Sequence, residues 1–130
     1  MSSIARTGAT PVPPPAPVPV AGPEARAAVL AGLRRAVADR DGTAAPAFAG
    51  FPSDRFPVAG KTGTADLPPK APFAWFTSYA PVGSPKYVVV VMVEQGGHGG
   101  ESAAPVARVV YEKLFGLPTT GPRTGNDRSG

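Results

Sequence analysis

The sequence contains no cysteine and a single histidine, His98. The lack of cysteine excludes disulfides, thiolate catalysis and cysteine-based zinc sites. No apolar run reaches the roughly 18 residues that a membrane span requires, and the polar start of the chain around Arg6 is not a secretory signal. We therefore expect no cofactor, no metal site and no membrane span, and a cytoplasmic location for the chain as written.

Clusters of basic residues are also missing. Lys and Arg outnumber Asp and Glu by 13 to 9, which gives a formal net charge of +4. The arginines are scattered, however, and no basic run is interleaved with aromatic residues that could stack on bases. Nucleic acid is therefore not an expected partner.

Proline and glycine are abundant instead, with 18 and 16 of the 130 residues. Proline fixes φ and removes a backbone donor, so neither a helix nor a sheet can run through the proline-dense start of the chain. We expect a disordered or polyproline leader at 1–22, a folded part at 23–117 and a disordered polar tail at 118–130. A plain linker and an SH3-type ligand are alternative interpretations of the leader.

The folded part predicts an α+β unit with helices flanking an antiparallel meander, because the strands are joined by short connections. The expected elements are a helix from Pro23 to about Arg40, strands at 56–66, 74–80 and 87–94, and a helix after Ser102 with an apolar face of Val106, Val109, Val110 and Leu114. The unbroken run Val88–Val93 is typical of a strand buried on both faces. One short helix cannot cover both faces, so the three-stranded sheet is predicted to be incomplete.

The segment Ala59–Ala65, AGKTGTA, carries the most specific chemical pattern. A phosphate-binding P-loop needs glycine where Arg55 stands, and it opens a helix that Gly63 and Pro68-Pro69 prevent here. The remaining interpretation is a Lys-Thr-Gly strand of the kind found in penicillin-recognising serine enzymes.

The surrounding sequence extends this pattern. KTGTAD, WFTSYAP, PKYVVVVMVEQGGHGG and ESAAPVARVVYEKLFG follow one another in the order and spacing found at the end of a class B penicillin-binding protein. The chain from Pro23 to Leu117 thus resembles the C-terminal part of such a transpeptidase domain. The resemblance implies the penicillin-binding and serine β-lactamase-like fold, in which the domain's first strand pairs with the strand that matches 87–94.

The resemblance also implies roles in acyl transfer at a D-Ala-D-Ala terminus, with a peptidoglycan stem peptide or a β-lactam as partner. Lys61 would supply positive potential and support proton transfer around the nucleophile, and the hydroxyls of Thr62 and Thr64 would bind the ligand carboxylate. Gly63 would let an extended peptide lie along the strand edge. The backbone N–H of Thr64 would be one oxyanion-hole donor.

The nucleophile of that family is absent. No serine has lysine three residues later, as S-x-x-K requires, and the nearest match to the family's S-x-N motif is Ser53-Asp54-Arg55. Without a nucleophile and its base the acyl-transfer cycle cannot run, so we expect the chain to be inactive alone. Three hypotheses stay open: a truncated or split domain completed by a partner chain, a gene whose upstream frame encodes the rest, and a non-enzymatic interaction module or remnant that uses the open strand edge and the proline-rich leader. The family acts outside the cytoplasmic membrane, tethered by an N-terminal helix.

The other conspicuous residues favour structural roles. His98 is expected in a loop whose glycines let it pass close beneath the motif strand. Trp75, Phe76 and Tyr79 are expected in the core and on the sheet faces, and Asp66 at a strand end.

Overall fold

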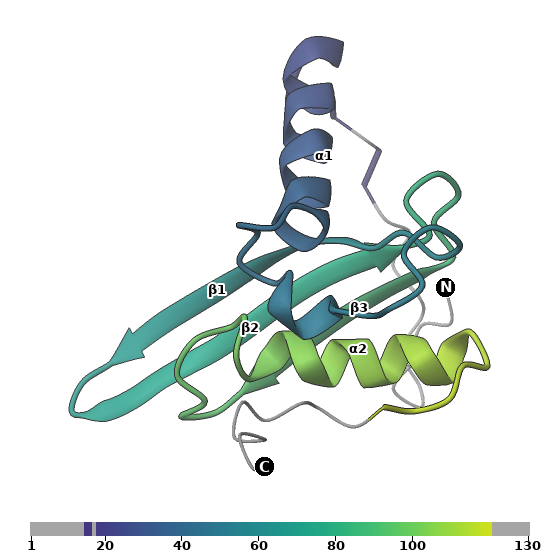
Figure 1. The fold of residues 1–130 in the computed structure, drawn as a ribbon. Helices are drawn as coiled ribbons and strands as arrows, with labels where there is room; N and C mark the ends of the chain where they lie inside the picture. Colours follow the sequence, from purple (N-terminus) through teal and green to yellow (C-terminus); the bar gives the residue numbers. More distant parts are fainter. Residues whose placement is uncertain (1–14, 17, 121–130) are drawn as a thin grey trace, which may run out of the picture.

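The computed structural model describes residues 15–16 and 18–120. In chain order these form α1 (Pro23–Ala38), the short 3₁₀ helix η1 (Pro46–Phe48), β1 (Ala59–Leu67), β2 (Lys70–Ala80), β3 (Tyr87–Val93) and α2 (Ala103–Leu114). The strands make one antiparallel sheet in the order β1-β2-β3. Helix α2 lies along one face of the sheet, and α1 projects from one end of it (Figure 1). The predicted α+β class and antiparallel meander are confirmed, whereas most of the predicted leader and tail lies outside the described residues.

The β1–β2 hairpin is longer than the sequence predicted. We expected the second strand to begin at Ala74, but β2 begins at Lys70, directly after Pro68-Pro69. Leu67 pairs with Lys70, so the two prolines form the whole connection between the strands. Proline lacks a backbone N–H, but at these turn positions no N–H is needed for the hydrogen bonds between β1 and β2. Pro72 is tolerated within β2 because pairing with β3 begins only at Ala74.

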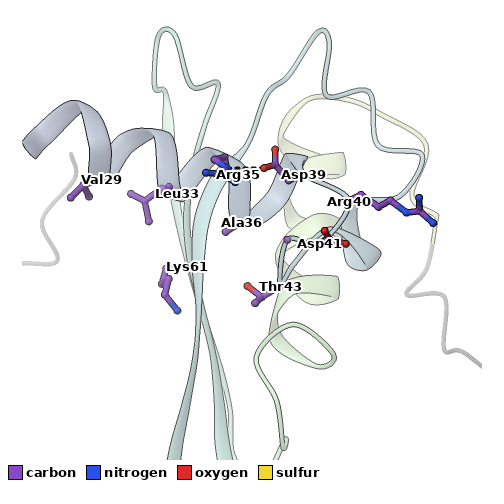
Figure 2. Close-up of a pocket in the computed structure, with 11 residues that line it drawn as sticks. Val29, Leu33, Arg35, Ala36, Asp39, Arg40, Asp41, Thr43 and Lys61 are labelled. Carbon is purple, nitrogen blue, oxygen red and sulfur yellow. Dashed lines mark hydrogen bonds and ion pairs between the residues drawn. The ribbon is translucent and has the colours of Figure 1, made fainter. Parts of the chain in front are cut away.

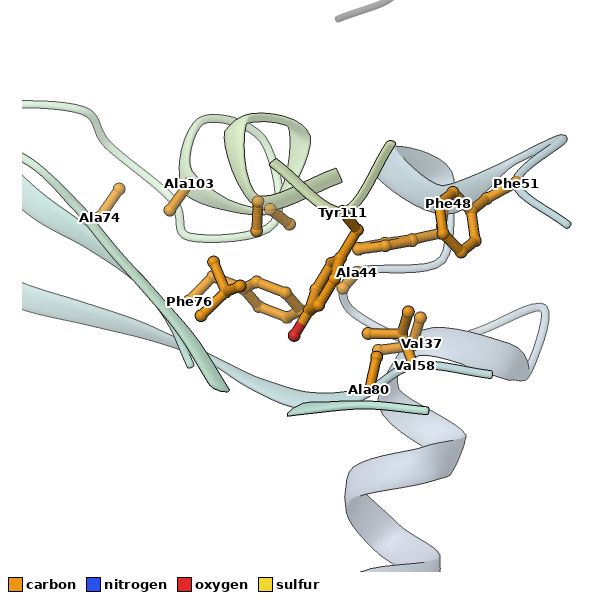
Figure 3. Close-up of a cluster of buried hydrophobic side chains, with 13 residues drawn as sticks. Val37, Ala44, Phe48, Phe51, Val58, Ala74, Phe76, Ala80, Ala103 and Tyr111 are labelled. Carbon is orange, nitrogen blue, oxygen red and sulfur yellow. The ribbon is translucent and has the colours of Figure 1, made fainter. Parts of the chain in front are cut away.

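Alternation along β2 separates the two faces of the sheet. Four alternate residues are buried beneath α2: Ala74, Phe76, Ser78 and Ala80. The layer between helix and sheet is centred on Tyr111 and Phe76, both fully buried, and Phe48 of η1 packs against Phe76 with 5.9 Å between ring centroids (Figure 3). The core therefore lies on one side of the sheet only.

Polar groups within this core are paired with one another. The Tyr111 hydroxyl donates to Ser78 Oγ at 3.1 Å, and Ser78 Oγ donates to the carbonyl of Val89 at 3.2 Å. Burial raises the pKa of Tyr111, against the smaller lowering by its hydrogen bond with Ser78. The phenol thus stays a proton donor that joins α2 to β2 and β3.

The buried face of α2 is only partly the predicted one. Of the expected residues Val106, Val109, Val110 and Leu114, Val110 packs against the core, but the fully buried residues are Ala103, Ala104, Ala107, Tyr111 and Glu112. Small alanines let the helix axis approach the sheet closely, which leaves Val106 and Leu114 44% and 40% exposed. Ser102 stands at the predicted N-cap position, yet its hydroxyl donates to the Gly96 carbonyl rather than to the helix.

The far face of the sheet is open along β3. Val88, Val90 and Met92 are 64%, 57% and 48% exposed there, beside Trp75 of β2 at 39%. Among the described residues no element covers this face of β3, and no strand pairs with the outer edge of β3. This arrangement agrees with a sheet that is incomplete, as the valine run predicted.

A nearly buried ion pair anchors α2 to the segments on either side of it. The Arg108 guanidinium donates to Glu112 Oε1 at 2.9 Å and to the carbonyls of Ala47 and Ala49 at 3.0 and 2.7 Å. Thr120 donates its N–H and its hydroxyl to the Glu112 carboxylate at 3.0 and 2.6 Å. Burial raises the pKa of Glu112, but the hydrogen bonds from Thr120 and Arg108 together outweigh it, so the pKa lies below its ordinary value.

Candidate functional site

Strand β1 forms the other edge of the sheet and carries the Lys-Thr-Gly motif. Lys61 pairs with Thr77, and Thr77 pairs with Val90, so these residues form one row across the open face. The next row on the same face begins with Gly63 and continues through Trp75 and Met92. The side chain of Lys61 is therefore placed on the face of the sheet opposite α2, between α1 and the exposed apolar residues of β3.

The two threonines of the motif lie on the opposite face of β1. Thr62 and Thr64 pair with Phe76 and Ala74, whose side chains face α2. Thr64 is exposed and Thr62 half-buried. Because β1 is an edge strand, all of these residues also border the free side of the strand, along which an extended chain could pair.

Hydrogen bonds hold the motif in a defined arrangement. Lys61 Nζ donates to the carbonyl of Thr62 at 2.7 Å, which draws the ammonium group along the strand. The Thr62 hydroxyl donates to the hydroxyl of Thr43 at 2.8 Å. A threonine hydroxyl has one proton to donate, so in this arrangement the proton of Thr43 is left for a further acceptor.

Sequence reasoning did not identify Thr43. It lies in the loop after α1, nineteen positions before its partner in the chain. The only available signal was its place between Gly42 and Ala44, just after the helix ends. Ala44 N–H bonds to the carbonyl of Ala36, and this bond fixes the loop against the helix and so sets the position of Thr43.

A groove of about 840 Å³ separates α1 from β1. Its apolar lining comes from Val29, Leu33 and Ala36 of α1, and its polar lining includes Lys61 and Thr43. In Figure 2, Lys61 lies below Leu33 of α1, and Thr43 lies on the opposite side of β1. A cation and a hydroxyl at the mouth of a partly apolar groove suit a ligand that ends in a carboxylate.

The glycine-rich loop lies directly against the motif strand. A Cβ at Gly99 would meet the carbonyl of Trp75 and would lie 2.7 Å from that of Gly63. One at Gly100 would meet the carbonyl of Thr43. The prediction that glycines let this loop pass close to the strand is therefore confirmed, while His98 within it is exposed.

The described serines differ widely in their surroundings. Ser78 is buried and bonded to Val89 and Tyr111, and Ser102 is bonded to Gly96. Among the described side chains, no hydrogen bond joins a serine to a lysine, the contact that activates a nucleophile of the S-x-x-K type. In the same part of the chain, no helix combines the length and apolarity of a membrane crossing.

Comparison with known proteins defines the class. The family model described as the penicillin-binding protein transpeptidase domain matches residues 5–112. The chain belongs to this family.

Particular relatives agree with that assignment. The peptidoglycan D,D-transpeptidase MrdA of Haemophilus influenzae is 36% identical over 96 residues, covering 62% of this chain and 14% of the relative. The peptidoglycan D,D-transpeptidase PbpA of Mycobacterium tuberculosis is 42% identical over 64 residues, or 42% of this chain and 13% of the relative. This chain thus spans about one seventh of the length of each of these relatives.

Solved structures show the same fold. The crystal structure of Pseudomonas aeruginosa PBP2 in complex with WCK 5153 superposes with a TM-score of 0.70 and 30% identity, covering 95% of this chain and 26% of that one. The D,D-transpeptidase domain of a peptidoglycan glycosyltransferase from Eggerthella lenta gives a TM-score of 0.53 and 32% identity, over 67% of this chain and 19% of that one. The chain therefore has the fold of part of a penicillin-binding transpeptidase domain.

Proposed function

We propose that this chain supplies one wall of a peptidoglycan D,D-transpeptidase site, and that the nucleophile comes from a partner or an upstream segment. The observation that carries the proposal is the placement of Lys61 on the face of the sheet opposite α2, in a row with Thr77 and Val90. An element that docks on the exposed apolar residues of this face brings its own groups next to Lys61. Docking also removes water, which strengthens every charge interaction at that point.

In this proposal the ligand is a stem peptide ending in D-Ala-D-Ala, or a β-lactam. Lys61 supplies the positive potential and the hydroxyls of Thr62 and Thr64 bind the carboxylate. Gly63 allows the peptide backbone to lie against the edge of β1, and the Thr64 N–H is one oxyanion-hole donor. The relatives are peptidoglycan enzymes, so we place the completed domain on the outer side of the cytoplasmic membrane.

The decisive experiment compares the chain alone with the chain mixed or co-expressed with a polypeptide that carries the upstream half of a related transpeptidase domain, including S-x-x-K and S-x-N. A fluorescent penicillin should label the upstream serine only in the mixture. Lys61→Ala should lower the labelling rate by about 100-fold or more, the order lost with a transition-state donor. Lys70→Ala removes an exposed lysine of β2 outside the site and should change nothing. Covalent labelling of the isolated chain would show that it holds a nucleophile after all.

The open edge of β3 favours a second candidate, a non-enzymatic interaction module. Unpaired N–H and C=O groups along an apolar strand readily accept a further strand. If this is the function, a pull-down with the chain should return the same protein partner whether or not Lys61 is replaced, and no mixture should gain penicillin labelling.

A further inference from the structure

The outer edge of β3 borders a second groove. This groove has a volume of about 750 Å³ and is lined by β3 residues and by Val110 and Leu114 of α2. In the described part of the chain nothing occupies it. The strand beside it is apolar from Tyr87 to Val93 and contains no proline or inward-facing charge, the usual protections of a free edge.

We propose that two copies of this chain pair through β3, antiparallel and centred on Val90, in the absence of a complementing transpeptidase half. The pairing extends each three-stranded sheet into a six-stranded one related by a two-fold axis. It uses the β3 edge of both copies at once, so the assembly is closed at two and leaves both β1 edges at its outer ends.

Charge fixes the register. One lysine, Lys86, directly precedes β3, and one glutamate, Glu94, directly follows it; both are exposed. In an antiparallel pair centred on Val90, Lys86 of each copy lies opposite Glu94 of the other, which makes two identical ion pairs. Opposite charges on facing positions stabilise a sheet and like charges destabilise it.

Neighbouring registers lose both ion pairs. Centring the pair on Val89 sets Lys86 opposite Met92, and centring it on Val91 sets Glu94 opposite Val88. Either shift faces a charge with an apolar side chain, whereas the Val90 register keeps apolar residues together. All three registers keep the same side chains on the same face of the sheet, so the end charges alone select the Val90 register.

The apolar pairs in this register also fit. Tyr87 lies opposite Val93, an aromatic facing a β-branched residue, and Val88 lies opposite Met92. On the helical side of the sheet, Val110 and Leu114 border the groove. The two copies of α2 thus approach one another across the two-fold axis with apolar side chains between them.

This inference goes beyond the proposed function, but both proposals involve the outer edge of β3. The first strand of a complete transpeptidase domain is expected at the same edge of β3. Self-pairing and completion of the domain therefore exclude each other, and a complementing half should separate the dimer as it binds.

The test is the association state of the full 130-residue chain, measured by sedimentation equilibrium over a wide concentration range. The unmodified chain should be a dimer. Lys86→Glu or Glu94→Lys alone sets like charges opposite each other twice and should weaken the dimer roughly tenfold or more. The double variant Lys86→Glu/Glu94→Lys restores both pairs and should return the affinity to that of the unmodified chain. Lys70→Glu alters the net charge equally, away from β3, and should leave the dimer intact.

Recovery in the double variant excludes misfolding as the cause of the single-variant losses. Hydrogen exchange gives a second readout, since the amides of β3 should be more protected at high protein concentration than at low. A monomer at every concentration, or an association that ignores the charge swaps, overturns the proposal. If the chain is a monomer but gains penicillin labelling with an upstream half, only the dimer proposal is contradicted. If it is a dimer that never gains labelling, only the proposed function is contradicted.

Discussion

Replacing Arg108 by methionine tests whether the ion pair on α2 holds the fold together. The side chains of Arg108 and Glu112 are only 11% and 3% exposed, so the change leaves a carboxylate buried without its counter-charge. It also removes the donors to the carbonyls of Ala47 and Ala49. Breaking a buried pair from one side costs about 3–5 kcal/mol. A small domain has about 5–15 kcal/mol of stability in total, so the loss should be at least about a fifth of it.

The chain contains a matched control on α1. Arg35 and Asp39 make the same i, i+4 ion pair at 2.7 Å, but their side chains are 75% and 47% exposed. Water already screens such a pair, so Arg35→Met should change the stability far less than Arg108→Met does. Both variants have the same helix propensity change and the same change in net charge. The two sites differ in burial and in the bonds that only Arg108 donates to the carbonyls of Ala47 and Ala49.

Urea unfolding followed by circular dichroism measures both variants, at one protein concentration so that self-association contributes equally. The midpoint should fall far more for Arg108→Met than for Arg35→Met, at an unchanged slope. The double variant Arg108→Met/Glu112→Leu removes the orphaned charge and should recover much of the loss. Equal losses for the two single variants, or no recovery in the double variant, would refute the reasoning from burial.

Two further predictions concern acid and the glycine loop. Because the native pKa of Glu112 lies below its ordinary value of 4.5, its contribution is complete above that value and is lost as the pH falls through the native pKa. The stability difference between the unmodified chain and Glu112→Gln should therefore shrink in acid titrations of the unfolding free energy; a constant difference would contradict this. Gly99→Ala should destabilise the chain because its Cβ meets backbone atoms of β1 and β2. Gly32→Ala on α1 meets nothing and should raise the thermal midpoint slightly; equal effects of the two would count against the close packing.

The sequence predicts the order and type of the elements well because these depend on local patterns. The valine run of β3 and the helix begun by Pro23 were readable from spacing alone, and their bounds agree with the structure within three residues. The start of β2 was missed because Pro72 argues locally against a strand. Only the limited extent of β3, a property of the whole sheet, makes that proline acceptable.

The buried face of α2 could not be found in the same way. Hydrophobicity selects Val106 and Leu114, but the helix buries alanines because close approach to the sheet gains more contacts there. The contact between Thr62 and Thr43 was not predicted from the sequence for a related reason. It joins segments that only the tertiary fold brings together. Local patterns identify which residues can carry chemistry, and packing decides which of them meet.

The two edges of the sheet differ in chemistry, and this difference separates their roles. The β1 edge carries a lysine, two hydroxyls and a glycine, all of which can be hydrated when no ligand is present. Losing a ligand there costs little, so the edge suits reversible pairing with an extended peptide. The β3 edge carries seven consecutive apolar residues, which water solvates poorly. A partner at β3 should therefore stay bound while ligands exchange at β1, and the Lys61 groove should remain equally accessible in the monomer and in the dimer.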